Sequence, residues 1–175
     1  MKILLSEIMN EKNAVRKITA PIELACFEMN GVRYEFRKKG SVDLTITNQG
    51  NRKVLLNGTA EVSLAAPCDR CLSEVEVIVP IKVDKELDFA QSEEERTENL
   101  DETNYISGYD LDVDLLVYDE ILIGFPMKVL CKEDCKGICK VCGANLNEGE
   151  CGCDRTVPDP RMSVIRDIFN NFKEV

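Results

Sequence analysis

The chain has 175 residues, of which 44% are hydrophobic and 31% charged, enough to bury the core of an ordinary domain but too short for a multidomain enzyme. Aromatic residues make up only 6%, so the core is expected to be aliphatic. The chain contains no histidine. This absence excludes Ser-His-Asp and Cys-His triads, HExxH metalloproteases and histidine-ligated zinc hydrolases.

The net charge of −10 comes from one stretch of the chain. Between Asp84 and Glu120 there are 14 acidic and 2 basic residues, and the rest of the chain is close to neutral. The centre of this stretch is polar and without period, which predicts an acidic surface loop at about 91–108. We interpret it as a solvated tether; the alternative is an acidic arm for a basic partner such as a ribosomal protein.

From Pro21 to Phe89 apolar residues alternate with polar ones, the period of β-strands with one buried face. The alternation is clear in 41–48, 60–64 and 74–79. Turn signals occur at Asn30-Gly31, at 48–50 and at Asn57-Gly58, the last of which fits either a turn or a bulge within one long strand. The stretch from Lys2 to Lys17 is ambiguous between strand and helix. The pattern predicts an α+β fold in which an antiparallel meander or small barrel-like sheet is packed by one or two helices.

The apolar period changes to that of a helix after the acidic stretch. Asp112 or Asp114 can cap a helix over about 112–124, with Pro126 as the stop. Its expected apolar face consists of Leu115, Leu116, Tyr118, Ile121, Leu122 and Phe125. A shorter terminal helix opens at Pro160. We therefore expect a β-rich core domain over 1–125, and a cysteine-rich segment with a terminal helix over 126–175.

Nine cysteines and no signal peptide point to a reducing compartment, where clustered thiols more often bind metals than form disulfides. No apolar run approaches the roughly 18 residues needed to cross a bilayer. We therefore expect a cytoplasmic protein that is not bound to a membrane.

Six of the nine cysteines lie between residues 131 and 153. The Cys-Lys-Val-Cys-Gly sequence of 139–143 has the form of a zinc knuckle, and Cys151-Gly152-Cys153 offers a second close pair. The predicted ligands of one structural Zn²⁺ are Cys139, Cys142, Cys151 and Cys153. Cys131 and Cys135 are alternates to the second pair, and six thiolates could also hold two clustered metals. Thiolate-only ligation favours a closed structural site over a catalytic one.

A separate Cys-Asp-Arg-Cys sequence occupies 68–71, between two expected strands. Its spacing is that of thioredoxin-type redox sites, but no helix follows to lower a thiol pKa. The alternatives are a half-site that joins the C-terminal metal, or a turn that displays Arg70. Cys26 is interpreted as a small core residue.

Basic residues lie on one strand and on neighbouring turns. They would form an RNA-binding patch if these turns gathered at one end of the sheet; otherwise they are solvated charges that keep sheet edges from pairing. The candidates are Arg33, Arg37, Lys38, Lys39, Arg52 and Lys53.

Three stretches together resemble the YceD family of bacterial and plastid proteins, named for accumulation of large-subunit ribosomal RNA. They are CDRCL at 68–72, DLLVYDEILIGFPMKVLC at 114–131 with CKGICKVCGANLN just beyond, and DPRMSVIRDIF at 159–169. The resemblance implies a non-enzymatic ribosome biogenesis factor that supports synthesis, processing or stability of 23S rRNA. Its expected partners are ribosomal RNA or large-subunit ribosomal proteins, with no small-molecule substrate. The family motif singles out Cys68, Arg70 and Cys71.

Two other functions remain open at this point. One is a thiol redox or metal-dependent enzyme that uses Cys68 and Cys71. The other is a zinc-ribbon adaptor that binds only protein.

Overall fold

The computed structural model describes residues 1–90, 104–154, 165 and 168–169. The chain divides into two compact units. The sheet unit comprises Met1–Pro67 and Glu74–Val129, and the cysteine unit comprises Cys68–Ser73 and Leu130–Val175. Most of the predicted acidic loop lies outside the described residues.

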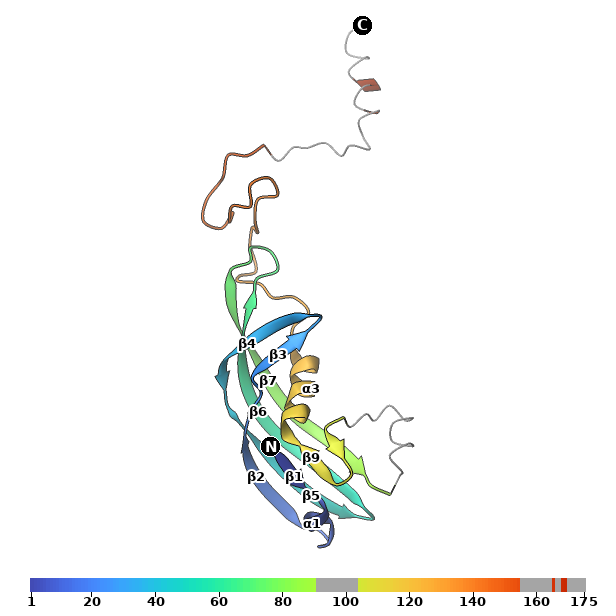
Figure 1. Cartoon of the computed structure of the whole chain (residues 1–175). Coiled ribbons are helices and arrows are strands. Elements are labelled where there is room, and N and C mark those ends of the chain that lie inside the picture. Colours follow the sequence, from blue (N-terminus) through green and yellow to red (C-terminus); the bar gives the residue numbers. More distant parts are fainter. Residues whose placement is uncertain (91–103, 155–164, 166–167, 170–175) are drawn as a thin grey trace. The chain divides into compact units, whose positions relative to one another are not determined.

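The sheet unit is built around one long strand, β6 (Lys53–Pro67) (Figure 1). Along one edge, β7 (Glu74–Asp88) pairs with it antiparallel from Lys53–Asp88 to Pro67–Glu74. Along the other edge, β5 (Ser41–Gly50) pairs with its first half and β4 (Val32–Lys39) with its second. Two outer strands complete the six-stranded sheet: β2 (Val15–Pro21) on β5, and β3 (Cys26–Met29) on β4.

The predicted alternation matches the buried face of this sheet. Val42, Leu44 and Ile46 of β5 are almost inaccessible to solvent, whereas Asp43 is exposed and Thr45 is half-buried. The antiparallel sheet and its helix are therefore as predicted, but the sheet is open rather than barrel-like. Among the described residues β7 pairs only with β6 and forms one edge of the sheet. The strands β2 and β3 lie at the other edge, so no closed ring of hydrogen-bonded strands forms.

The three turn signals have different outcomes. Asn30 and Gly31, with φ of 53° and 77°, connect β3 and β4 as predicted. The turn expected at 48–50 lies instead at Asn51 and Arg52, with φ of 52° and 62°, and the 48–50 stretch forms an irregularity at the end of β5. Asn57-Gly58 is neither turn nor bulge, since both residues pair in regular register on both sides of β6.

The ambiguous N-terminal stretch forms a short strand, one helical turn and a longer strand. β1 (Lys2–Leu4) pairs with β9 (Asp110–Asp112), which also pairs with β8 (Ile106–Ser107) in a separate three-stranded sheet. The helical turn α1 (Ser6–Met9) follows β1, and its Ile8 is buried. The ambiguity reflects this mixture, because no single period runs through residues 1–17.

The predicted helix is α3 (Val113–Gly124), and Asp112 caps it by accepting hydrogen bonds from the backbone N–H groups of Asp114 and Leu115. Its buried face differs from the expected one. Leu115 and Leu122 are 40% and 46% exposed. The buried positions follow i, i+3, i+4, i+7 and i+8: Val113, Leu116, Val117, Glu120 and Ile121.

Of the predicted terminal helix, Ile165, Ile168 and Phe169 are described; they are helical and exposed. Its expected start at Pro160 lies outside the described residues. Within the described part of the chain, no helix combines the length and apolar character needed to span a membrane.

Candidate metal centres

Eight of the nine cysteines form two groups within the cysteine unit. The first cluster consists of Cys68, Cys71, Cys131 and Cys135, and the second cluster of Cys139, Cys142, Cys151 and Cys153. In each cluster the four sulfur atoms lie within 4.8 Å of one another. Either cluster could hold a metal ion.

The second cluster brings together the four ligands predicted from the sequence. Its first half is a tight turn in which the backbone N–H of Gly143 donates to the carbonyl of Cys139 at 2.8 Å. The N–H of Cys139 donates to the carbonyl of Ala144 at 2.8 Å. Gly143 has a φ of 75°, where a side chain would be strained, so glycine is needed to close this turn. Cys151 and Cys153, half-buried on either side of Gly152, complete the set.

Backbone N–H groups favour the thiolate form in this cluster. The N–H groups of Cys142 and Val141, with a contribution from the Cys151 thiol, lower the pKa of Cys139 to about 6. The neighbouring Cys142 and Cys151 raise the pKa of Cys153 to about 12. Four sulfurs this close cannot all ionise without a nearby cation, and a bound metal ion would supply that charge.

The first cluster begins in the turn that connects β6 and β7. The N–H of Leu72 donates to the carbonyl of Cys68 at 2.9 Å, and the N–H of Cys68 donates to the carbonyl of Ser73 at 2.8 Å. Cys68 and Cys71 are buried within this turn, with 0% and 6% of their surfaces exposed.

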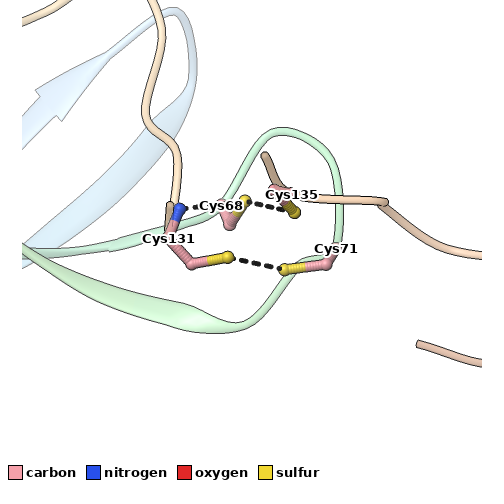
Figure 2. Close-up of side chains that lie close together, drawn as sticks. All are labelled: Cys68, Cys71, Cys131 and Cys135. Atoms are coloured by element: carbon pink, nitrogen blue, oxygen red, sulfur yellow. Dashed lines mark hydrogen bonds between the residues drawn. The ribbon is translucent and has the colours of Figure 1, made fainter. Parts of the chain in front are cut away.

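Cys131 and Cys135 complete the first cluster rather than replacing Cys151 and Cys153 (Figure 2). The sulfur of Cys68 is 3.8 Å from that of Cys135, and the sulfur of Cys71 is 3.5 Å from that of Cys131. The N–H of Cys131 also points to the sulfur of Cys68 at 3.4 Å. The structure thus groups Cys131 and Cys135 with the cysteines of the 68–71 turn, and not with Cys139 and Cys142.

Burial and hydrogen bonding act in opposite directions on Cys68. Burial raises its pKa, but the N–H groups of Arg70, Cys71 and Cys131 outweigh burial and lower the pKa to about 6. The Cys135 side chain and burial raise the pKa of Cys131 to about 12. The first cluster thus repeats the second: backbone N–H groups lower the pKa of Cys68 as they do that of Cys139, and neighbouring thiols raise the pKa of Cys131 as they do that of Cys153.

A short hairpin supports both clusters. Ile138 and Asn145 form an antiparallel bridge, and the N–H of Leu146 donates to the carbonyl of Gly137 at 2.9 Å. Asn147 donates from Nδ2 to the sulfur of Cys135 at 3.3 Å. The sequence by itself did not identify this role of Asn147.

Arg70 is held inside the cysteine unit. Its guanidinium donates to the carbonyl of Cys135 at 2.9 Å, and its own carbonyl accepts from the N–H of Ile138 at 3.0 Å. A Cβ at Gly137 would lie 3.0 Å from that carbonyl oxygen, so the two backbones are in close contact. Arg70 therefore helps to position Cys135, although its side chain is exposed.

Both clusters fit a tetrahedral ion with thiolate ligands. Zinc–sulfur bonds of about 2.3 Å separate the sulfurs of a tetrahedral site by about 3.8 Å. Thiolate sulfur is a soft ligand that suits zinc, and N–H groups directed at the sulfurs provide the outer support typical of such sites.

The basic residues do not gather at one end of the sheet. Lys38 pairs with Ser63 near the end of β6, whereas Lys53 pairs with Asp88 at its start. Ten residues of strand separate these positions, about 33 Å. Lys53 forms ion pairs with Glu86 at 2.8 Å and Asp88 at 3.6 Å.

The basic residues of β4 form a group of their own. Arg33, Arg37, Lys38 and Lys39 are exposed on this strand. Two of them have partners: Arg37 forms an ion pair with Glu74, and Lys39 donates to the carbonyl of Leu24 at 2.9 Å. The candidate RNA face is therefore confined to β4, and Arg52 and Lys53 lie apart from it.

Several curated proteins share part of this sequence. An uncharacterised protein of Mycobacterium tuberculosis is 29% identical over 116 residues, which cover 66% of this chain and 56% of that protein. An uncharacterised protein of Mycobacterium leprae is 27% identical over 93 residues, which cover 53% of this chain and 43% of that protein. The chain spans about half the length of these relatives.

A plant relative carries a descriptive name. The chloroplastic large ribosomal RNA subunit accumulation protein YCED homolog 1 of Arabidopsis thaliana is 34% identical over 50 residues, which cover 29% of this chain and 16% of that protein. No solved structure matches. The family model described as large ribosomal RNA subunit accumulation protein YceD matches residues 56–169. Because this match covers more than half of the chain and includes both cysteine clusters, the protein belongs to the YceD family.

Proposed function

We propose that this protein is a non-enzymatic ribosome biogenesis factor that supports the synthesis, processing or stability of 23S rRNA. Membership of the YceD family carries the proposal, since the family description and the name of the Arabidopsis relative both refer to accumulation of large-subunit ribosomal RNA. The expected partners are ribosomal RNA or proteins of the large subunit.

We also propose that the second cluster holds a structural Zn²⁺ ion. Four cysteine sulfurs supply all the ligands of a tetrahedral site, which leaves no vertex for a catalytic water. The ion would neutralise the crowded thiolates and hold the Cys139–Cys142 turn against the Cys151–Cys153 pair. In this role the ion holds a recognition surface in shape and does not form part of a reaction centre.

Loss of the gene tests the biological role. In a deletion strain we expect a lower ratio of 23S to 16S rRNA and fewer mature large subunits, measured by RNA quantification and sucrose-gradient profiles. The wild-type gene and the Cys26→Ser variant should both restore them, because Cys26 lies outside both clusters. A deletion strain with unchanged rRNA ratio and ribosome profile would contradict the proposal.

The basic residues of β4 suggest where RNA would bind. Arg33 and Lys38 are exposed and can contact phosphates. We expect the Arg33→Ala, Lys38→Ala double variant to bind a 23S rRNA fragment more weakly and to reduce the slope of log K against log salt by about 1 to 2, because two phosphate contacts are lost.

The Arg52→Ala, Lys53→Ala variant is the matched control for this experiment, since it removes the same charge from the opposite end of β6. Its affinity and salt slope should stay close to those of the wild type. Equal losses in the two double variants would show that only total charge matters and would rule out a specific RNA face on β4.

A further inference from the structure

The turn at 68–73 has the same backbone form as the knuckle at 139–144. In each, the N–H of the residue four positions after the first cysteine donates to that cysteine's carbonyl, at 2.9 Å for Leu72 and 2.8 Å for Gly143. In each, the N–H of the first cysteine donates to the carbonyl five positions on, at 2.8 Å in both turns. The residue after the second cysteine is left-handed in both, with φ of 63° at Leu72 and 75° at Gly143.

This equivalence was hidden in the sequence because leucine occupies the left-handed position of the first turn. A leucine at positive φ costs about 1 to 2 kcal/mol relative to glycine. Leu72 is 65% exposed, so burial of its side chain does not account for the conformation. The backbone is held in this form by the turn's own hydrogen bonds, and the form directs both cysteine side chains to one point.

We propose that Cys68, Cys71, Cys131 and Cys135 bind a second Zn²⁺ ion, separate from the ion of the second cluster, and that the Cys-Asp-Arg-Cys turn is a zinc knuckle.

The sulfur positions favour a single bound metal ion over disulfide bonds or an iron–sulfur cluster. The separations of 3.8 Å and 3.5 Å are those between ligands of a single tetrahedral zinc and are far too long for disulfide bonds. An iron–sulfur cluster would bind its cysteines through different irons and hold their sulfurs farther apart than the 4.8 Å limit found here.

The surroundings also separate this site from a redox dithiol. Reactive Cys-x-x-Cys pairs place an accessible thiol at a helix N-terminus, whereas here the turn leads directly into β7 and Cys68 is fully buried. Two further contacts orient the far pair of ligands: the amide of Asn147 donates to the sulfur of Cys135, and Arg70 donates to the Cys135 carbonyl. Such contacts orient ligands in structural metal sites.

The ion of the first cluster would have a different effect on the fold from the ion of the second cluster. Its two cysteine pairs are 60 residues apart in the chain, counted from Cys71 to Cys131. The ion therefore closes a long loop and fixes the start of the C-terminal segment to the turn between β6 and β7, whereas the ion of the second cluster closes only a local loop.

Native mass spectrometry of the full chain, refolded with excess ZnCl₂ under reducing conditions, counts the ions directly. We expect two zinc ions in the wild type and in the Cys26→Ser control. The Cys68→Ser, Cys71→Ser and the Cys139→Ser, Cys142→Ser double variants should each retain one. The proposal would be overturned if the wild type bound one ion and only the Cys139→Ser, Cys142→Ser variant lost it.

A second measurement uses the wild type alone and so does not depend on the folding of a variant. Cys131 is exposed, and removal of the metal should loosen residues 130–154, so that its thiol separates from the neighbouring thiols and becomes open to iodoacetamide. We expect alkylation at Cys131, mapped by peptide mass spectrometry, to be blocked in the zinc-loaded protein and to rise at least tenfold after chelation, with no change at Cys26. Alkylation of Cys131 that is unaffected by the chelator would overturn the proposal. Both readouts are independent of any effect on 23S rRNA.

Discussion

Asn147 shows how a residue outside the cysteine set can control a metal site. Its Oδ1 accepts from the N–H of Lys136 at 2.9 Å, and its Nδ2 donates to the sulfur of Cys135 and to Oδ1 of Asn145. The amide lowers the pKa of Cys135 because it donates to the thiolate. One side chain therefore fixes the backbone beside a ligand and stabilises the charged form of that ligand.

Asn147→Ala should lower the zinc affinity of the first cluster by about tenfold, the lower end of the effect of removing an outer contact to a metal ligand. Competition with a chromophoric chelator measures this loss, and the second cluster in the same molecule should keep its affinity. Asn10→Ala, an exposed change in the sheet unit, is the control. If Asn147→Ala bound both zinc ions as tightly as the wild type does, the amide would contribute only to the shape of the loop.

At the scale of the elements, Gly58 explains why β6 can pair on both sides without interruption. A Cβ at this position would lie 2.6 Å from Cδ2 of Leu44 and 2.8 Å from the carbonyl oxygen of Asp43. Only glycine lets β5 approach this closely. The Asn57-Gly58 pair thus looks like a turn signal in the sequence, but it serves a close contact between strands.

Gly58→Ala should lower the free energy of unfolding of the sheet unit by about 2 kcal/mol, because the backbone of β5 must move to admit a methyl group. Urea denaturation followed by circular dichroism measures the change. Thr59→Ala, at the exposed position next to it, should stay within about 0.5 kcal/mol of the wild type. If Gly58→Ala and Thr59→Ala unfolded at the same urea concentration, β5 and β6 would have room for a methyl group at residue 58, contrary to the structure.

At the scale of the whole molecule, the two units depend on different forces. The sheet unit contains the apolar core, including Phe27, Leu44, Leu64 and Ile121, which are at most 1% exposed. The described part of the cysteine unit contributes only cysteines to the buried apolar residues. Metal binding would therefore supply most of its stability, on the order of 10 kcal/mol for a structural zinc ion.

Removal of metal should therefore loosen one unit and spare the other. With a strong chelator we expect amide hydrogen exchange to rise at least a hundredfold in residues 130–154, with protection in β5, β6 and the core of β7 unchanged. Hydrogen exchange mass spectrometry with peptide coverage of both units makes the measurement, and restored zinc should reverse it. Simultaneous loss of protection in both units would mean that the sheet also depends on the metal.

The sequence alone was sufficient wherever a feature depends on near neighbours in the chain. The period-two strands, the Asp112 cap of α3 and the Asn30-Gly31 turn all follow from local backbone preferences, and the structure contains each of them. The sulfur set of the second cluster belongs to this group too, since all four of its cysteines lie within fifteen residues.

The tertiary structure alone decided the features that join distant parts of the chain. Cysteine spacing does not say whether Cys131 and Cys135 join the pair that follows or the turn 60 residues before, because that choice depends on where folding brings the 68–71 turn. For the same reason the sequence could not separate Arg52 and Lys53 from the basic residues of β4, since their distance depends on the register of β6. An open sheet and a barrel also share the same alternation, and only the pairing of the edge strands distinguishes them.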